Sequence, residues 1–217
     1  MHPSTRAPQA LCEPGLLLRR CVSLAVLDAI VSPDWQYRYY SFDGAWGDDA
    51  MMASMRNGQG DDLFIAFGEG GVFIKGFAHE APMAPRASGR DGKVWPGIYD
   101  GVPETLLTFR DEPAFSRDSV TFCIWWDVRN PAWRLGVREF ARGKDPDGSE
   151  ELLAIYDGKP QTYATWASDY YETDVALDAV TSVYRHEPLT EQLVRELNPE
   201  ADLGAILEES ADWPYGA

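Results

Sequence analysis

Five polar side chains in the sequence could take part in acid–base or ligand-binding chemistry. His79 and Glu80 are neighbours directly after a strand-like segment, and an imidazole beside a carboxylate can accept and return a proton. Arg38, Arg56 and Asp127 lie elsewhere in the chain, so only the fold could bring them to the same site. Adjacent residues on an extended chain point to opposite sides, which favours a structural hydrogen-bonding role for His79 over a joint role with Glu80.

Residues that ligate metals are few and are poorly spaced for a site. The histidines and cysteines form no HxH, HxxxH or CxxC pattern, so the sequence predicts neither a metal site nor a cofactor. They are His2, His79, His186, Cys12, Cys21 and Cys123. The chain also lacks the GxSxG turn of serine hydrolases. The glycine-rich run 68–71 joins two expected strands and opens no helix, which argues against a phosphate loop.

Negative charge is concentrated in the last third of the chain. The net charge is −16, of which the residues from Asp145 onward carry −14. Nucleic acid is excluded as a partner because phosphate binding needs clustered lysine and arginine. Two interpretations remain for this acidic part. It is either a solubilising surface or a docking face for a basic protein, with Glu150, Glu151, Asp169 and Glu172 as contact residues.

The paired tryptophans Trp125 and Trp126 offer a candidate anchor for a partner. On a strand the two side chains face opposite ways, so one of them could be exposed. An exposed tryptophan is a common anchor of protein interfaces, and we name Trp125 as that candidate. The alternative is burial under the C-terminal helices, because the expected sheet needs cover on each face.

Length and composition indicate one globular domain. A chain of 217 residues with 45% hydrophobic residues is long enough to bury a core without disulfides. Residues 1–14 contain three prolines and little hydrophobic pattern, which predicts a flexible tail before a single domain over 15–217. The apolar stretch 16–31 is interrupted by charges, so we expect no membrane span. Three cysteines without a pairing pattern favour a reducing, cytoplasmic location.

The order of periodic segments predicts an α+β fold. An N-terminal helix over 16–30 precedes strands at 35–42, 51–56, 63–67 and 72–77, the last two forming a hairpin. A long loop over 81–97 and a short helix at 103–109 lead to a second hairpin, 121–127 with 133–140, and a further strand at 152–156. The fold class is therefore a mainly antiparallel sheet with an N-terminal helix and a helical C-terminal third.

The helical third is expected to hold four short helices after Pro160. In the first of them, Tyr163, Trp166, Tyr170 and Tyr171 recur on one helical face. Such a stripe either packs into the core or lines a ligand groove, and packing is the commoner outcome.

Four segments carry a resemblance to a known group of sequences. Residues 38–42 (RYYSF), 52–58 (MASMRNG), 75–80 (KGFAHE) and 112–115 (EPAF) resemble a bacterial family of uncharacterised proteins. In size, acidity and expected fold the chain is also similar, more loosely, to bacterial immunity proteins of the SMI1/KNR4-like group. The first resemblance implies no activity, and the second implies a protein that binds another protein.

Two functional hypotheses follow from the sequence. The first is a non-enzymatic, immunity-like binding protein that docks a basic partner on its acidic surface. The alternative is an enzyme or small-ligand binder whose site is assembled from the dispersed polar residues named above. A deep pocket with convergent polar groups would favour the second, and an acidic or aromatic surface patch would favour the first.

Overall fold

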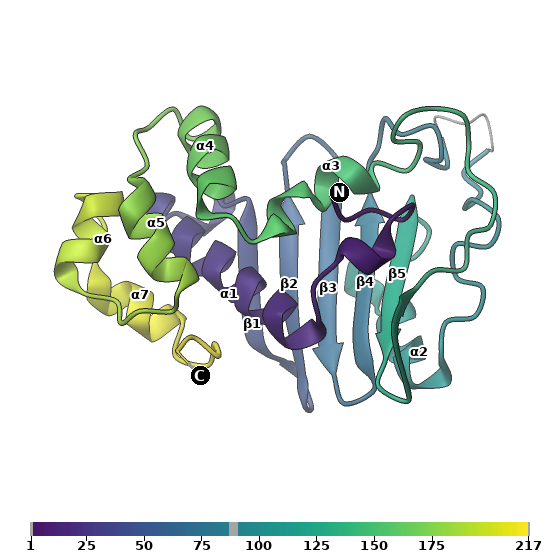
Figure 1. Cartoon of the computed structure of the whole chain (residues 1–217), viewed down its shortest axis with the longest axis horizontal. Helices are drawn as coiled ribbons and strands as arrows, with labels where there is room; N and C mark the ends of the chain where they lie inside the picture. Colours follow the sequence, from purple (N-terminus) through teal and green to yellow (C-terminus); the bar gives the residue numbers. More distant parts are fainter. Residues whose placement is uncertain (1, 87–90, 217) are drawn as a thin grey trace.

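A six-stranded antiparallel sheet forms the centre of the protein. The computed structural model describes residues 2–86 and 91–216, and the strands follow one another in chain order across the sheet. Figure 1 shows this meander between a group of helices and a region of long loops. The strands are β1 (Tyr40–Gly47), β2 (Ala50–Arg56), β3 (Asp62–Gly68), β4 (Gly71–Phe77), β5 (Phe122–Asp127) and β6 (Asn130–Arg134). The expected α+β fold class is confirmed.

One face of the sheet is covered by the N-terminal helix α1 (Pro14–Val31). The helix is apolar nearly all round, and its residues from Cys21 to Ile30 are all buried. They pack on strand side chains such as Met55, Ile65 and Ile74, which share one face because paired residues in neighbouring strands point the same way. This helix and the inner strand face form the main hydrophobic core.

The opposite face of the sheet is covered by the segment between β4 and β5, including α2 (Leu107–Arg110). Met83, Ile98 and Leu106 from this segment pack on Phe73 and Trp125. Cover on both faces of the sheet is expected because 63–67 is apolar throughout, and the structure confirms it. Four residues of the expected 81–97 loop, 87–90, lie outside the described residues.

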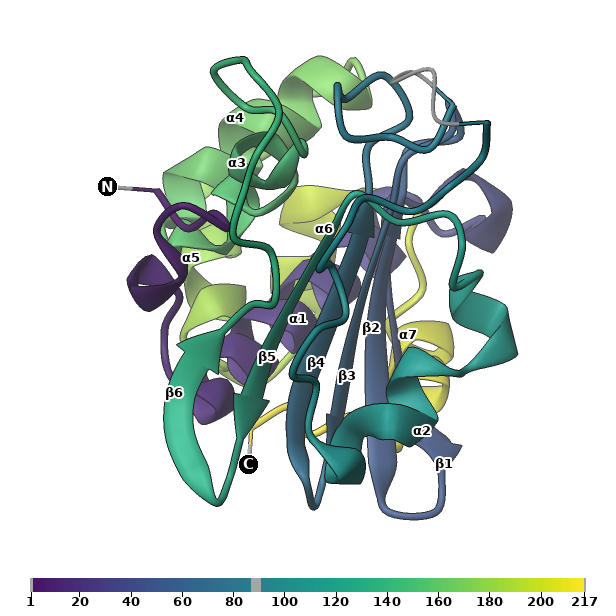
Figure 2. The same cartoon turned by 90° about the vertical axis from the view of Figure 1, so that its right-hand side faces the viewer.

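The C-terminal third forms a helical layer beside α1. It contains α3 (Ser149–Leu152), α4 (Pro160–Tyr170), α5 (Leu177–Tyr184), α6 (Glu191–Leu197) and α7 (Leu203–Glu209). Figures 1 and 2 show α5, α6 and α7 gathered around α1 at one end of the molecule. The four helices expected after Pro160 are present, and Tyr163 of the aromatic stripe is buried in the core.

The segment predicted as a flexible tail, 1–14, is packed against the protein over its described residues 2–14. Thr5 is buried, and its hydroxyl donates a 2.5 Å hydrogen bond to Oδ2 of the buried Asp147. Its backbone N–H donates to Oγ of Ser149 at 3.0 Å. The prediction failed because these contacts join residues more than 140 positions apart and leave no periodic signal in the sequence.

Three predicted strands differ from the structure. The strand expected over 35–42 is displaced, because Trp35–Tyr37 form a 3₁₀ turn and β1 covers Tyr40–Gly47. The second hairpin is present, but the bounds 133–140 are wrong for its second strand, since β6 covers Asn130–Arg134 and the tight turn falls at 128–129. Pro131 is tolerated there because β6 is an edge strand. The strand expected over 152–156 is also wrong, because this segment is helical and continues α3 as a 3₁₀ turn over Ala154–Asp157.

Candidate functional site

His79 forms a carboxylate–imidazole pair with a residue that sequence analysis did not name. Nδ1 of His79 lies 2.7 Å from Oδ1 of Asp61, and the backbone N–H of His79 donates to the same oxygen at 2.7 Å. The other carboxylate oxygen accepts a 2.7 Å hydrogen bond from Nδ2 of Asn57. Glu80 is more distant, with Oε1 3.9 Å from Nε2 of His79. Asp61, at the start of β3, therefore orients the imidazole.

The hydrogen bond to Asp61 raises the pKa of His79 above its ordinary value, because the carboxylate stabilises the imidazolium. Such a pair can serve as a general base or as a cationic hydrogen-bond donor. The side chain is 40% exposed, and it lines a cavity of about 740 Å³ together with Phe77, Arg86 and Ser119. This volume would accommodate a small organic ligand.

Arg38 holds chain segments together and does not reach the His79 site. Its guanidinium forms a two-pronged ion pair with Glu209 of α7. It also donates to the carbonyl oxygens of Ser32 and Pro33, at 2.9 and 2.8 Å. With only 4% of the side chain exposed, Arg38 links the start of β1 to the C-terminal helices.

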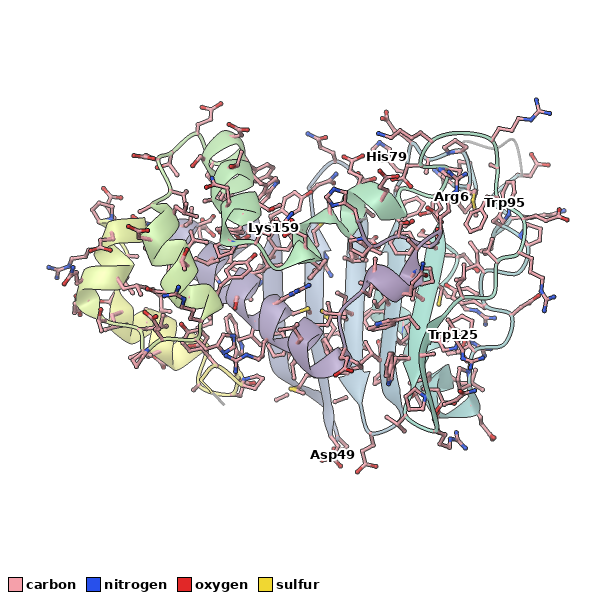
Figure 3. The ribbon with its side chains drawn as sticks, in the orientation of Figure 1. Arg6, Asp49, His79, Trp95, Trp125 and Lys159 are labelled. Atoms are coloured by element: carbon pink, nitrogen blue, oxygen red, sulfur yellow. The ribbon has the colours of Figure 1, made fainter. Side chains whose placement is uncertain are left out.

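Asp127 also stays apart from His79. It pairs with Gly71, at the opposite end of β4 from Phe77, and at the usual rise per residue Gly71 and Phe77 are about 20 Å apart. Figure 3 shows His79 at one end of the sheet and Asp49, in the β1–β2 turn, at the other. Arg56 lies at the same end of the sheet as His79, in register with Asp62, and its guanidinium lies over the Phe64 ring at 5.5 Å. The five candidates therefore form no single catalytic site.

A buried ion pair that the sequence did not predict lies on the sheet face that carries Phe64 and Phe77. Nζ of Lys75, which is completely buried, donates to Oδ1 of Asp62 at 2.6 Å. Desolvation lowers the pKa of Lys75 and raises that of Asp62. The ammonium group also lies 5.3 Å from the Phe64 ring and 5.8 Å from the Phe77 ring. The sequence contains no sign of this pair, because Lys75 lies within the apolar strand pattern of β4 and its partner Asp62 belongs to β3.

The acidic residues of the last third lie at the surface. Of the 17 acids from Asp145 onward, all within the described residues, only Asp147 is buried. Glu151, Asp169 and Glu172 are exposed, and Glu150 is half-buried. Each of the three basic residues in this part of the chain forms an ion pair with an acid close to it in the sequence. The N···O distances are 3.5 Å for Lys159, 3.7 Å for Arg185 and 3.1 Å for Arg195. Most of the negative charge therefore faces solvent.

An aromatic cluster lies among these acids. Tyr170 is 43% exposed and stacks on Trp166 at 5.2 Å, and both rings contact Tyr39 at 5.0 and 4.7 Å. Burial raises the pKa of Tyr39 to about 12, with further contributions from Tyr170, Asp61 and Glu151. Glu151 is therefore within electrostatic range of the cluster. We call Tyr39, Trp166 and Tyr170, with the acids Glu151, Asp169 and Glu172, the aromatic–acidic surface.

Trp125 cannot be the partner anchor that the sequence suggested. It is only 3% exposed and packs with Phe73 and Leu106 beneath the segment between β4 and β5. The alternative interpretation, burial, holds for Trp125, although the cover comes from that segment and not from the C-terminal helices. The exposed aromatic residue near the acids is Tyr170, which sequence analysis had placed in a stripe expected mainly to pack in the core.

The part of the chain that the structure describes holds neither a cluster of metal ligands nor a membrane-spanning helix. Within residues 2–86 and 91–216, no three side chains of histidine, cysteine, aspartate or glutamate come together as metal ligands. Over the same residues, none of the helices has both the length and the hydrophobicity needed to cross a bilayer. The three cysteines are free thiols, and Cys21 and Cys123 are buried as expected of small core residues.

Comparison with known proteins places this chain in no group. It matches no family model, and neither the curated proteins nor the solved structures include a significant match.

Proposed function

We propose that the protein is a non-enzymatic, immunity-like binding protein that docks a basic protein on its aromatic–acidic surface. The observation that carries the proposal is the exposed ring of Tyr170 beside the exposed carboxylates of Asp169, Glu172 and Glu151. Protein interfaces combine aromatic anchors with a polar rim, and a rim of one charge attracts a partner of the opposite charge. The three free thiols fit a reducing, cytoplasmic setting in a bacterial cell.

The test is a charge reversal matched by a control of equal charge. The triple variant Glu151→Lys, Asp169→Lys and Glu172→Lys changes the aromatic–acidic surface. Glu196→Lys, Glu200→Lys and Glu208→Lys make the same charge change on exposed residues of α6, α7 and the segment between them. A basic partner captured with the wild-type protein is measured against each variant at low and physiological ionic strength.

The first variant should slow association strongly and reduce its dependence on salt, because electrostatic steering acts mainly on the association rate. The control variant should have a smaller effect, since its charges lie on other helices. Equal effects from both variants would mean that only the net charge matters. An association rate that neither the first variant nor salt changes would refute the proposed surface.

A second candidate function is binding of a small ligand in the cavity beside His79. The observation that favours it is the Asp61–His79 pair, which presents a polarised imidazole to a cavity of about 740 Å³. Screening a small-molecule library by thermal shift, with Phe77→Ala and His79→Ala as binding-site variants, tests this candidate. A ligand that stabilises the wild-type protein and neither variant would support it.

A further inference from the structure

A second, positively charged cavity lies between α1, the start of α4 and α5. Its volume is about 360 Å³, and its lining includes Arg19, Arg20, Ser23, Thr181, Tyr184 and Arg185. Three arginines thus line one cavity in a protein whose net charge is −16. None of the described residues that line it is acidic. The cavity concentrates positive charge where the rest of this region is negative.

Arg20 is held in place by a backbone conformation built around it. Gly158 has a φ of +78°, and a Cβ atom there would lie 2.2 Å from Nη2 of Arg20. The guanidinium also donates through Nη1 to the carbonyl oxygen of Tyr156. Only glycine leaves room for this contact in this left-handed conformation. The loop before α4 therefore holds the Arg20 guanidinium in position at one side of the cavity.

The hydroxyl of Tyr184 lacks the partner that buried hydroxyls normally have. Among the buried side-chain polar atoms of residues 2–86 and 91–216, only this oxygen and Nε1 of Trp125 have no hydrogen-bond partner. Leaving such a donor unpaired is unfavourable. Tyr184 is among the residues that line the cavity.

The amino end of α4 adds to the positive potential. This 11-residue helix begins at Pro160, which lines the cavity, and no side chain caps its N-terminus. The first N–H groups of a helix carry a partial positive charge that favours phosphate and other anions. Two nearby carboxylates are already engaged. Asp157 accepts from Thr162 and lies 3.5 Å from Lys159, labelled in Figure 3. Glu187 lies 3.7 Å from Arg185 and is the ion-pair partner that a bound anion would replace there.

We propose that this cavity binds the phosphate group of a small phosphate ester. Arginine is the side chain best suited to phosphate, because its planar fork donates two parallel hydrogen bonds to the oxygens. Arg20 and Arg185 supply the charge, and Tyr184 donates to a further oxygen. The cavity exceeds the volume of a phosphate group alone, which leaves room for a small organic group. This inference is independent of the proposed docking function.

The test measures binding of inorganic phosphate and of ribose 5-phosphate to the full-length protein by calorimetry at constant ionic strength. Both probes should bind, and the ester should bind more tightly because it fills more of the cavity. Arg185→Ala should weaken both by about tenfold, which corresponds to about 1.4 kcal/mol. Arg129→Ala, which removes an exposed charge at the β5–β6 turn, should leave binding unchanged.

Tyr184→Phe separates ligand binding from folding. The free variant should be as stable as the wild type or more stable, because it loses an unpaired buried hydroxyl. Its affinity for both probes should nevertheless fall several-fold. The proposal is overturned if neither probe binds at concentrations up to about 10 mM. Such weak binding would correspond to a binding free energy smaller than about 3 kcal/mol in magnitude. The proposal is equally overturned if Arg185→Ala and Tyr184→Phe bind like the wild type.

Discussion

The hydroxyl of Tyr163 in α4 donates a 2.7 Å hydrogen bond to Oδ1 of Asp28 in α1. Asp28 is completely buried, and its Oδ2 accepts three further hydrogen bonds. These come from the backbone N–H groups of Tyr39 and Tyr40, at 3.0 and 2.7 Å, and from the hydroxyl of Tyr171 at 2.8 Å. One carboxylate thus joins α1, the start of β1 and the C-terminal helices.

This carboxylate should make stability depend on pH. Burial raises the pKa of Asp28 from its ordinary value of 3.8 to about 6, although its hydrogen bonds act in the opposite direction. Between these two values the folded protein binds a proton that the unfolded chain has lost. The free energy of unfolding should therefore fall by roughly 2 kcal/mol as the pH rises from about 4 to about 6, and by roughly 3 kcal/mol between about pH 3 and pH 7.

Asp28→Asn should remove this pH dependence and keep the fold. With the amide oxygen in the place of Oδ2, three donors keep their acceptor, and the amide N–H₂ can donate to the hydroxyl of Tyr163. Urea denaturation of both proteins at several pH values measures the difference. Asp28→Ala is the contrasting variant and should lose at least about 3 kcal/mol, because it leaves several buried donors unpaired. A constant difference between wild type and Asp28→Asn from pH 4 to pH 7 would contradict the prediction.

The pKa values of His79, at the surface, and His186, in the core, should be shifted in opposite directions. Asp61 raises the pKa of His79, whereas burial lowers the pKa of His186, which stacks on Tyr215. The stabilisation from charged His79 is present at low pH and is lost as the pH rises through its folded pKa. Nitrogen-detected NMR titration should show Asp61→Asn lowering the pKa of His79 and leaving that of His186 unchanged. Identical His79 titrations in both proteins would show that Asp61 does not control it.

The N-terminal segment should contribute to stability. Thr5→Val keeps the side-chain shape but removes the hydroxyl that bonds to Asp147 and Ser149. Because Asp147 is buried, the free energy of unfolding should fall by about 1–3 kcal/mol. Thr173→Val, at an exposed position, serves as the control and should change stability by less than about 0.5 kcal/mol. If both variants unfold at the same denaturant concentration, residues 2–14 are not anchored as the structure indicates.

Most of the fold could be predicted from the sequence because periodic patterns and turn residues specify it locally. The hairpin of β3 and β4 follows from two apolar runs around Gly68–Gly71, and α1 follows from an apolar stretch ended by Ser32–Pro33. The failure at 1–14 has a non-local cause. The structure of this segment depends on contacts with distant residues, such as Thr5 with Asp147, and such contacts leave no short-range pattern.

The candidate sites were harder to predict, because each is assembled across the chain. His79 was named from its residue type, but its partner Asp61 lies 18 positions away. The arginine-lined cavity combines neighbours on α1 with Arg185 and a glycine at 158, and none of these is unusual in its local sequence. Charge asymmetry is visible without a structure, since it is a property of composition and needs no fold.

Truncation of Trp125 should mainly lower stability, whereas truncation of Tyr170 should mainly weaken partner binding. Trp125→Ala removes a buried indole and should lower the free energy of unfolding by about 3–5 kcal/mol. Tyr170→Ala removes a partly exposed ring and should cost no more than about 1 kcal/mol of stability. For a basic partner, however, Tyr170→Ala should raise the dissociation rate at least tenfold, since aromatic anchors account for much of an interface's affinity. Thermal unfolding and biolayer interferometry provide the two measurements. If Tyr170→Ala releases a captured basic partner no faster than the wild type, the aromatic–acidic surface does not hold that partner.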